Sequence, residues 1–332
     1  MGIGAQKAGT TWLARNLQAH PGIWMPKEKE LHYFDEKIKQ EGGLWGRLRG
    51  DRPMDKRWRR QARSRLRRVP RGPLAQDLGW DLRYFLGDPG DRWYASLFGP
   101  GEGRVTGEAT PDYAILGKDD VAHVHAIMPD AKIIFFMRSP LERPWSAMDM
   151  RTRIRGESIE ELKDRKFYRR VDARGSRQRT EYSRTLENWG AFYPEDQFFV
   201  GFLEDVHLFP DRLLRDLYGF LGVDPSFVPP GADRKVHSGK QETIPTRFAV
   251  HLAEGYREEI ARLSERFGGY ASFWLYCAER LIDDPPAGEH VPYPLYASSL
   301  WEEWTGGSGP GPENRPRYAS GTLASLGTAR WD

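Results

Sequence analysis

The chain has 332 residues, of which 39% are hydrophobic and 13% aromatic, so it is long enough to bury a large core. Its 50 basic and 47 acidic residues leave a net charge of only +3, which excludes the positive field of a general nucleic-acid or membrane binder. Its one cysteine, Cys277, cannot form an internal disulfide, and no long apolar run or signal peptide is seen. We therefore expect a soluble, cytoplasmic protein with no membrane span and no specific nucleic-acid partner.

The first residues predict a strand, an anion-binding turn and a helix. A short apolar start at Ile3 runs into Gly-Ala-Gln-Lys-Ala-Gly-Thr-Thr at residues 4–11, and a helix is expected over residues 10–19. N–H groups at a helix start carry partial positive charge and bind phosphate, while Lys7 adds a full charge and the two threonines add hydroxyl donors. The lysine precedes the last glycine, so this is not the Gly-Lys-Ser/Thr order of a Walker A loop. This strand is short for the middle of a sheet. We therefore expect that the given sequence lacks the first part of the strand.

An arginine-rich run follows at residues 51–72. One interpretation is a solvated helical face or loop. The other is a contact for an acidic substrate or partner, because clustered arginines bind anions well.

The middle of the chain alternates buried strands with helices. Apolar runs at residues 132–137 and 198–202 predict buried parallel strands. Helical patterns are expected at about 119–128, from about Glu142, and at 178–193, 209–221 and 245–268. This alternation predicts an α/β fold of three layers, with a central parallel sheet flanked by helices. We expect a single domain over residues 1–304, in which residues 36–100 could be a substrate-binding insertion, followed by an irregular tail at 305–332.

A second anion site is predicted where the strand at 132–137 ends. Arg138 follows this strand, and Ser146 lies eight residues further on. Ligands of open α/β sheets bind at the carboxyl ends of strands, and a guanidinium with a hydroxyl suits a phosphate. A basic loop at residues 235–240, Lys-Val-His-Ser-Gly-Lys, offers a third segment. Phosphate sites so far apart in the sequence indicate a nucleotide that is phosphorylated at both ends.

With these motifs in order, the chain resembles sulfotransferases that use 3′-phosphoadenosine 5′-phosphosulfate (PAPS). The loop at 4–11 resembles the 5′-phosphosulfate loop of that family, and residues 138–146 resemble its 3′-phosphate loop. Residues 107–113, Gly-Glu-Ala-Thr-Pro-Asp-Tyr, resemble a segment of bacterial and heparan-type members, as do residues 202–206 and 213–225. The likeness spans roughly residues 3–270 and implies the P-loop-like fold of the family, PAPS as co-substrate and 3′-phosphoadenosine 5′-phosphate (PAP) as product. We expect no metal, because the eight histidines are scattered and no metal-binding Cys/His or HExxH spacing is seen.

The resemblance also implies which residues hold the donor. These are Lys7, Ala8, Gly9, Thr10, Thr11, Trp12, Arg138, Ser146, Gly239 and Lys240. Trp12 would stack on adenine, although a core tryptophan is an open alternative. For Gly239 and Lys240 the alternative is a structural loop.

The catalytic residues implied by the resemblance are Lys7, Glu30 and His32. Residues 29–35, Lys-Glu-Leu-His-Tyr-Phe-Asp, resemble a heparan-type segment whose glutamate is the general base, which gives that role to Glu30. His32 is the rival base, because small-molecule members use a histidine. Lys7 would stabilise charge on the leaving group.

The acceptor is expected to be a small-molecule, carbohydrate or lipid-like compound, bound by loops at 36–100 and 147–180. The aromatic residues of the first of these loops suit a bulky acceptor and fit core packing equally well. Two other functions stay open. One is a P-loop kinase, which would need a different loop order and an acidic residue at a strand end. The other is a non-catalytic protein that binds polyanions through residues 51–72.

Overall fold

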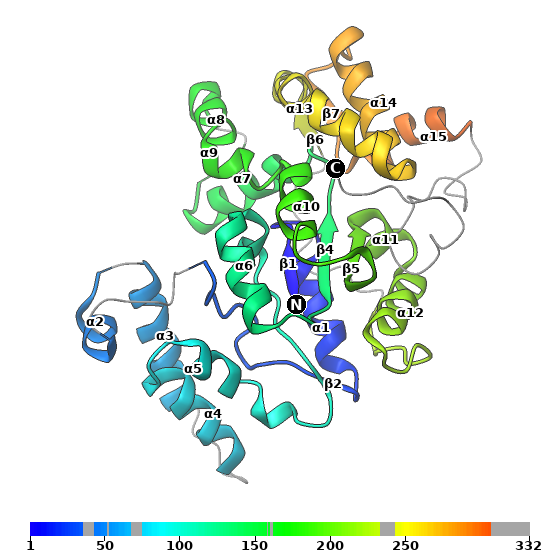
Figure 1. The fold of residues 1–332 in the computed structure, drawn as a ribbon. Helices are drawn as coiled ribbons and strands as arrows, with labels where there is room; N and C mark the ends of the chain where they lie inside the picture. The colour runs from blue at the N-terminus through cyan, green and yellow to red at the C-terminus, as the bar shows by residue number, and fades with distance from the viewer. Residues whose placement is uncertain are drawn as a thin grey trace.

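The centre of the fold is a parallel sheet of three strands, β1 (Gly2–Gly4), β4 (Ile133–Met137) and β5 (Phe198–Phe202), in the order β1-β4-β5 (Figure 1). Helices cover both faces of this sheet, so the predicted three-layer α/β fold is confirmed. The structure, a computed structural model, describes residues 1–35, 43–51, 53–67, 75–157, 159, 162–232 and 243–306.

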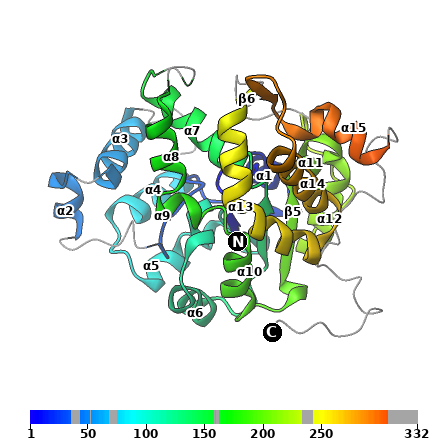
Figure 2. The same cartoon turned by 90° about the horizontal axis from the view of Figure 1, so that it is seen from above.

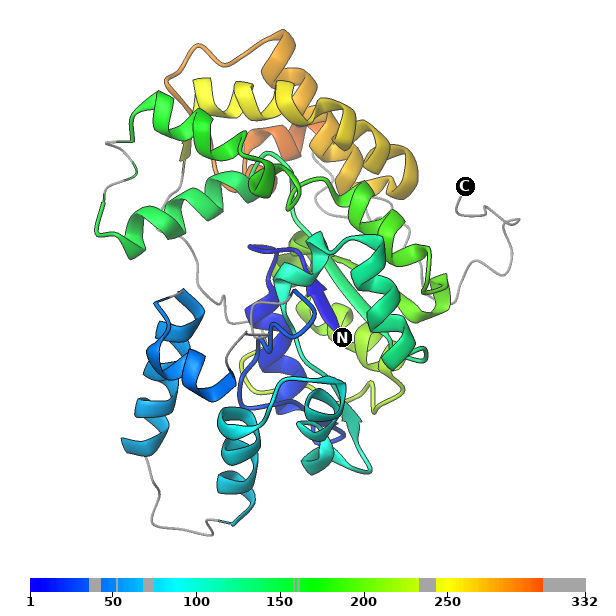
Figure 3. The ribbon, with the colours of Figure 1, turned by 60° about the vertical axis from the view of Figure 1, so that its left-hand side comes forward.

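Neighbouring side chains of β4 explain why both faces are covered. The ring of Phe135 lies 5.6 Å from that of Tyr182, the first residue of α10 (Tyr182–Gly190). The ring of Phe136 lies 6.4 Å from that of Trp12 on α1 (Thr10–Ala19). Successive side chains of a strand point to opposite faces, so α1 and α10 lie on opposite sides of the sheet (Figure 3). Every residue of β4 and β5 is buried, as their apolar runs predict.

The other elements surround this centre. On the side of α1 lies α12 (Pro210–Leu221), and on the side of α10 lies α6 (Lys118–Ile127). The other described helices are α2 (Gly43–Arg49), α3 (Pro53–Arg67), α4 (Ala75–Leu86), α5 (Asp91–Ser96), α7 (Arg143–Ile154), α8 (Asp164–Val171), α9 (Arg174–Arg177), α11 (Leu203–Leu208), α13 (Thr246–Phe267), α14 (Gly269–Asp283) and α15 (Ser299–Thr305). The short strands are β2 (Ile23–Trp24) with β3 (Val105–Thr106), parallel, and β6 (Thr243–Pro245) with β7 (His290–Pro292), antiparallel. Single 3₁₀ turns are η1 (Gly99–Gly101), η2 (Pro111–Ile115), η3 (Glu195–Gln197) and η4 (Leu295–Ala297).

One predicted helix is shorter in the structure, and one helix was not predicted. The helix expected at 178–193 is α10, which begins only at Tyr182. The chain turns at Thr180, whose hydroxyl accepts a hydrogen bond from Arg143. The helix expected at 245–268 is α13, but a second helix, α14, packs beside it (Figure 2). Gly268 and Gly269, with φ of 62° and 49°, make the sharp turn between the two helices.

The region at 36–100 is helical where it is described, and its aromatic residues form a core. The buried ones are Trp58, Trp80, Tyr84, Phe85, Trp93 and Tyr94, while Trp45 lies outside the described side chains. Trp80 and Tyr84 stack with ring centroids 5.0 Å apart, and the Trp80 indole N–H donates to the carbonyl of Leu97 at 2.9 Å. Core packing therefore accounts for these rings without an acceptor.

One arginine of the basic run has a structural contact. The Arg59 guanidinium donates to the carbonyls of Arg47 at 2.8 Å and Gly50 at 2.7 Å, which caps the end of α2. Arg60 and Arg63 are exposed on α3. Residues 52 and 68–72 of this run lie outside the described residues, as does the tail from residue 307. None of the helices in the described ranges is long and apolar enough to cross a bilayer.

A buried carboxylate joins the amino-terminal segment to the rest of the domain. Glu108 is 2% exposed. One of its oxygens accepts from the hydroxyls of Tyr94 and Tyr113 at 2.8 and 3.1 Å, and the other accepts from the Thr110 hydroxyl and the Leu31 N–H at 2.6 and 3.1 Å. Burial raises the pKa of Glu108, and the four hydrogen bonds oppose that rise.

Replacement of Glu108 by alanine should destabilise the protein. Several buried donors would lose their acceptor, so we expect the free energy of unfolding to fall by about 3 kcal/mol. Urea unfolding at neutral pH measures this loss. Glu102→Ala is the matched control, because Glu102 is exposed on the turn before β3 and its replacement should change stability little. Equal stability of the two variants would contradict the role given to Glu108.

Candidate active site

The loop after β1 is shaped to present backbone N–H groups. The Ala5 N–H donates to the carbonyl of Phe136 at 2.6 Å, which fixes the loop to β4. Lys7 and Gly9 have φ of 75° and 87°, in the left-handed region, and α1 begins at the next residue, Thr10. No side chain of the described residues caps this helix start. Its N–H groups are therefore available to an anion.

Positive charges crowd around Lys7. Burial, followed by the charges of Arg138 and Arg153, lowers the pKa of Lys7 to about 8, while the charge of Asp149 opposes this shift. An anion bound here would relieve both the repulsion and the cost of burying the ammonium group. The predicted loop thus has the electrostatics of an anion site.

Arg138 lies directly beside this loop. It follows β4, is 8% exposed, and donates from Nη1 to the carbonyl of Lys7 at 3.1 Å. Its Nε donates to the Glu142 carboxylate at 3.1 Å. Ser146, also 8% exposed, lies on α7, which starts from the same end of β4. The structure therefore brings together the two predicted anion sites, although they are about 130 residues apart in the sequence.

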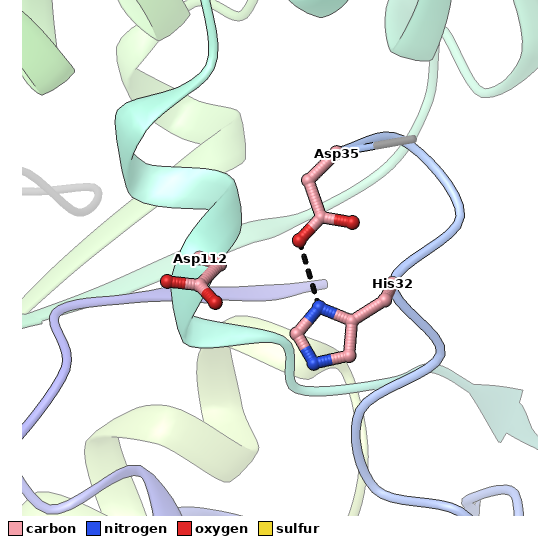
Figure 4. A group of neighbouring side chains, drawn as sticks. All are labelled: His32, Asp35 and Asp112. Carbon is pink, nitrogen blue, oxygen red and sulfur yellow. Dashed lines mark hydrogen bonds and ion pairs between the residues drawn. The ribbon is translucent and has the colours of Figure 1, made fainter. Parts of the chain in front are cut away.

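His32 lies between carboxylates. Its Nδ1 is 2.7 Å from an oxygen of Asp35 (Figure 4). Its Nε2 is 3.4 Å from an oxygen of Glu30. His32 is buried and has φ of 55°. Both ring nitrogens face oxygen acceptors, and this arrangement is satisfied when both carry hydrogen. In that form the ring donates to Asp35 and Glu30, and neither nitrogen has a lone pair that could accept a proton from an acceptor.

Glu30 is connected to the start of α1. The ammonium group of Lys29 donates to a Glu30 oxygen at 3.0 Å and to the Thr10 hydroxyl at 3.3 Å. Burial acts to raise the pKa of Glu30, but the hydrogen bond with His32 and the charge of Lys29 outweigh it and lower this pKa to about 2. Glu30 is thus a carboxylate near the predicted phosphosulfate loop.

A third carboxylate, Asp112, approaches the same histidine. Ligand-capable atoms of His32, Asp35 and Asp112 lie within 4.8 Å of one another (Figure 4). Asp112, however, accepts from Nη2 and Nε of Arg179 at 2.7 and 3.1 Å. A cation at this group would have to compete with Arg179 and with the His32–Asp35 hydrogen bond. Hydrogen bonding accounts for the cluster as it stands.

Trp12 connects α1 to Ala232. Its ring is 3% exposed and packs near Phe136, and its indole N–H donates to the carbonyl of Ala232 at 2.7 Å. These contacts fit the core alternative, and stacking on adenine stays a prediction. Ala232 immediately precedes residues 233–242, which lie outside the described residues together with the predicted Gly239 and Lys240. Of the remaining loop residues, Ala8 and Thr10 are buried and Thr11 is partly exposed.

Sequence analysis did not find several partners in this site. Asp35 is three residues from His32 and Glu142 is four residues from Arg138, but neither pair lies on a helix, so the helical spacing rule did not indicate either contact. Asp112 and Arg179 are 67 residues apart, and no local pattern indicates that they pair.

Comparisons with known proteins identify the family of this chain and a similar fold. The model of the Sulfotransferase family matches residues 1–227. The fold is similar to that of a sulfotransferase from Alicyclobacillus acidocaldarius, with 21% identity, a TM-score of 0.54, and coverage of 80% of this chain and 93% of that chain. A further similarity is to the sulfotransferase domain of the Synechococcus PCC 7002 olefin synthase, with 18% identity, a TM-score of 0.46, and coverage of 76% and 92%. Comparison with curated protein sequences found no match.

The titration of Lys7 tests the crowding of positive charge in the loop. We expect its ammonium group to titrate at about pH 8 in the free protein. NMR of protein labelled with ¹³C-lysine measures the midpoint, and Lys7→Arg identifies the signal by removing it. A midpoint near the ordinary lysine value of about 10.4 would contradict this environment.

Proposed function

Because this chain belongs to the sulfotransferase family, we propose that it transfers the sulfuryl group of PAPS to a hydroxyl or amine of a small-molecule, carbohydrate or lipid-like acceptor. The observation that carries the proposal is the pair of hydrogen bonds made by Lys29, to Thr10 at 3.3 Å and to Glu30 at 3.0 Å. They tie a carboxylate to the helix start that binds anions. A base and an anion site close together are what transfer to a hydroxyl requires.

The donor site is supported at both of its ends. The N–H groups at the start of α1 and the ammonium of Lys7 suit the 5′-phosphosulfate. The guanidinium of Arg138 and the hydroxyl of Ser146 suit the 3′-phosphate. The 3.1 Å bond from Arg138 to the Lys7 carbonyl keeps these two groups adjacent. When bound, PAPS supplies a sulfur that becomes bonded to the acceptor oxygen as its bond to the bridging phosphate oxygen breaks.

Glu30 is the group that takes the acceptor proton. It is a carboxylate whose side chain is 27% exposed, whereas that of His32 is 5% exposed and its nitrogens face Asp35 and Glu30. His32 orients Glu30 and compensates its charge. A low pKa makes Glu30 a weak base in the free protein, but proton transfer is required only as the new bond forms. The ammonium of Lys7 offsets the charge that develops on the departing PAP.

Substitution of Lys7 tests the leaving-group role. Lys7→Met keeps most of the side-chain volume and removes its charge, so we expect kcat for sulfate transfer to fall by about 10²–10³-fold. Transfer of sulfate from labelled PAPS, followed by mass spectrometry against a panel of hydroxyl and amine acceptors, gives the rate. Lys27→Met is the control, since Lys27 pairs with Asp81 outside the loop. Turnover of Lys7→Met near that of the wild type would contradict the role.

Glu30→Gln tests the identity of the base. It keeps the shape of the side chain but cannot accept the proton, so kcat should fall by about 10²–10⁴-fold while calorimetric affinity for PAP stays within a few-fold. Asp35→Asn and His32→Ala should cost less, because these residues position Glu30. If Glu30→Gln is active and only the histidine variant is inactive, His32 is the base.

The alternatives give different results in the same experiments. Membership in the sulfotransferase family favours sulfuryl over phosphoryl transfer. Binding of ATP that depends on magnesium, without binding of PAP, would support the kinase. Tight PAP binding without transfer to any acceptor would support the non-catalytic polyanion binder.

A further inference from the structure

A tyrosine near the carboxyl end of the chain contacts both residues of the predicted 3′-phosphate site. Nη2 of Arg138 donates to the hydroxyl of Tyr293, and the guanidinium carbon lies 5.2 Å from the centre of the Tyr293 ring. Burial raises the pKa of Tyr293, and the nearby side chain of Ser146 opposes that rise. Tyr293 follows β7 and is partly buried. It lies outside residues 1–227, the part of the chain that the family model matches.

The backbone around Tyr293 is fixed to the same site. The Leu295 N–H donates to one oxygen of Glu142 at 2.7 Å, and the other oxygen of Glu142 accepts from Nε of Arg138 at 3.1 Å. Glu142 is 1% exposed, so one buried carboxylate holds both the arginine and the tyrosine-bearing segment. On its other side the segment is paired through β7 with β6, where Val291 faces Ile244. A segment held on both sides positions the hydroxyl precisely and is unsuited to swing away.

The hydrogen-bonding capacity at this point matches a phosphate. A phenol that accepts a hydrogen bond from arginine still has its own proton to donate, and a phosphate dianion offers only acceptors. Arg138 has five N–H donors, of which the described residues engage three: Nε to Glu142, one Nη1–H to Lys7, and one Nη2–H to Tyr293. The two other donors have no hydrogen-bond partner among the described residues. A phosphate beside Ser146 can therefore use these two while Tyr293 keeps its place.

We propose that Tyr293 is a third ligand of the donor's 3′-phosphate, donating its hydroxyl proton beside Arg138 and Ser146. The inference rests on the proposed function, since it assigns a further residue to the same donor site. Tyr293 would thereby help this protein to select nucleotides with a 3′-phosphate. Its role is binding and positioning, and it takes no part in the transfer of the sulfuryl group.

The test compares PAP with AMP, which differs only in lacking the 3′-phosphate. Isothermal titration calorimetry is run with the wild type, Tyr293→Phe, Arg138→Ala and the control Tyr276→Phe, which loses a hydroxyl bonded to Glu303 away from the site. We expect Tyr293→Phe to weaken PAP about 10-fold and to leave AMP within twofold, because the lost bond goes to a charged acceptor. Tyr276→Phe should change neither affinity.

The outcomes separate the two proposals. If the wild type prefers PAP, and Arg138→Ala and Tyr293→Phe both reduce that preference, the assignment of Tyr293 is supported. If Arg138→Ala reduces it while Tyr293→Phe leaves PAP unchanged, the assignment is wrong and the donor site stands. Tighter PAP binding by Tyr293→Phe also overturns the assignment, since the hydroxyl would then compete with the phosphate. A wild type with no preference for PAP overturns the proposed donor and this inference together.

Discussion

The candidate site depends on the hydrogen bonds that the guanidinium of Arg138 donates. A buried charge of this kind is stable only when it is surrounded by acceptors, and here these come from three parts of the chain. The Lys7 carbonyl, the Glu142 carboxylate and the Tyr293 hydroxyl all accept from it. Because Arg138 follows the central strand β4, the topology of the sheet places this junction at the carboxyl ends of parallel strands, where α/β folds bind ligands.

A second buried charge sets the position of the proposed base. Glu108 accepts from the Leu31 N–H, and the residues on either side of Leu31 are Glu30 and His32. The Tyr33 N–H donates in turn to the Tyr113 hydroxyl at 2.8 Å, which itself donates to Glu108. The loop that carries the catalytic candidates is therefore fixed by hydrogen bonds to the domain interior. A base on such a loop loses little entropy when the acceptor arrives.

Much of the fold and part of the site could be predicted because their signals are local. Apolar runs indicated β4 and β5, since strands buried on both faces have no alternation. The helix start after the loop at 4–11 and the strand end before Arg138 were recognisable because both have characteristic sequences. The contacts between Asp112 and Arg179, and between Arg138 and Tyr293, join residues 67 and 155 positions apart, and no periodicity encodes them. The segment 290–296 was missed for the same reason, as its place follows from how α13 and α14 pack.

The environment of Lys7 also affects the thermodynamics of ligand binding. With a pKa of about 8, a substantial fraction of the free protein has a neutral amine in this loop under mildly alkaline conditions. A polyanion stabilises the ammonium form, so its arrival draws a proton from the buffer. The measured heat of binding then includes the ionisation enthalpy of that buffer, and apparent affinity declines as the solution becomes more alkaline. Binding of an anion at this loop would therefore couple the uptake of the ligand to the uptake of a hydrogen ion.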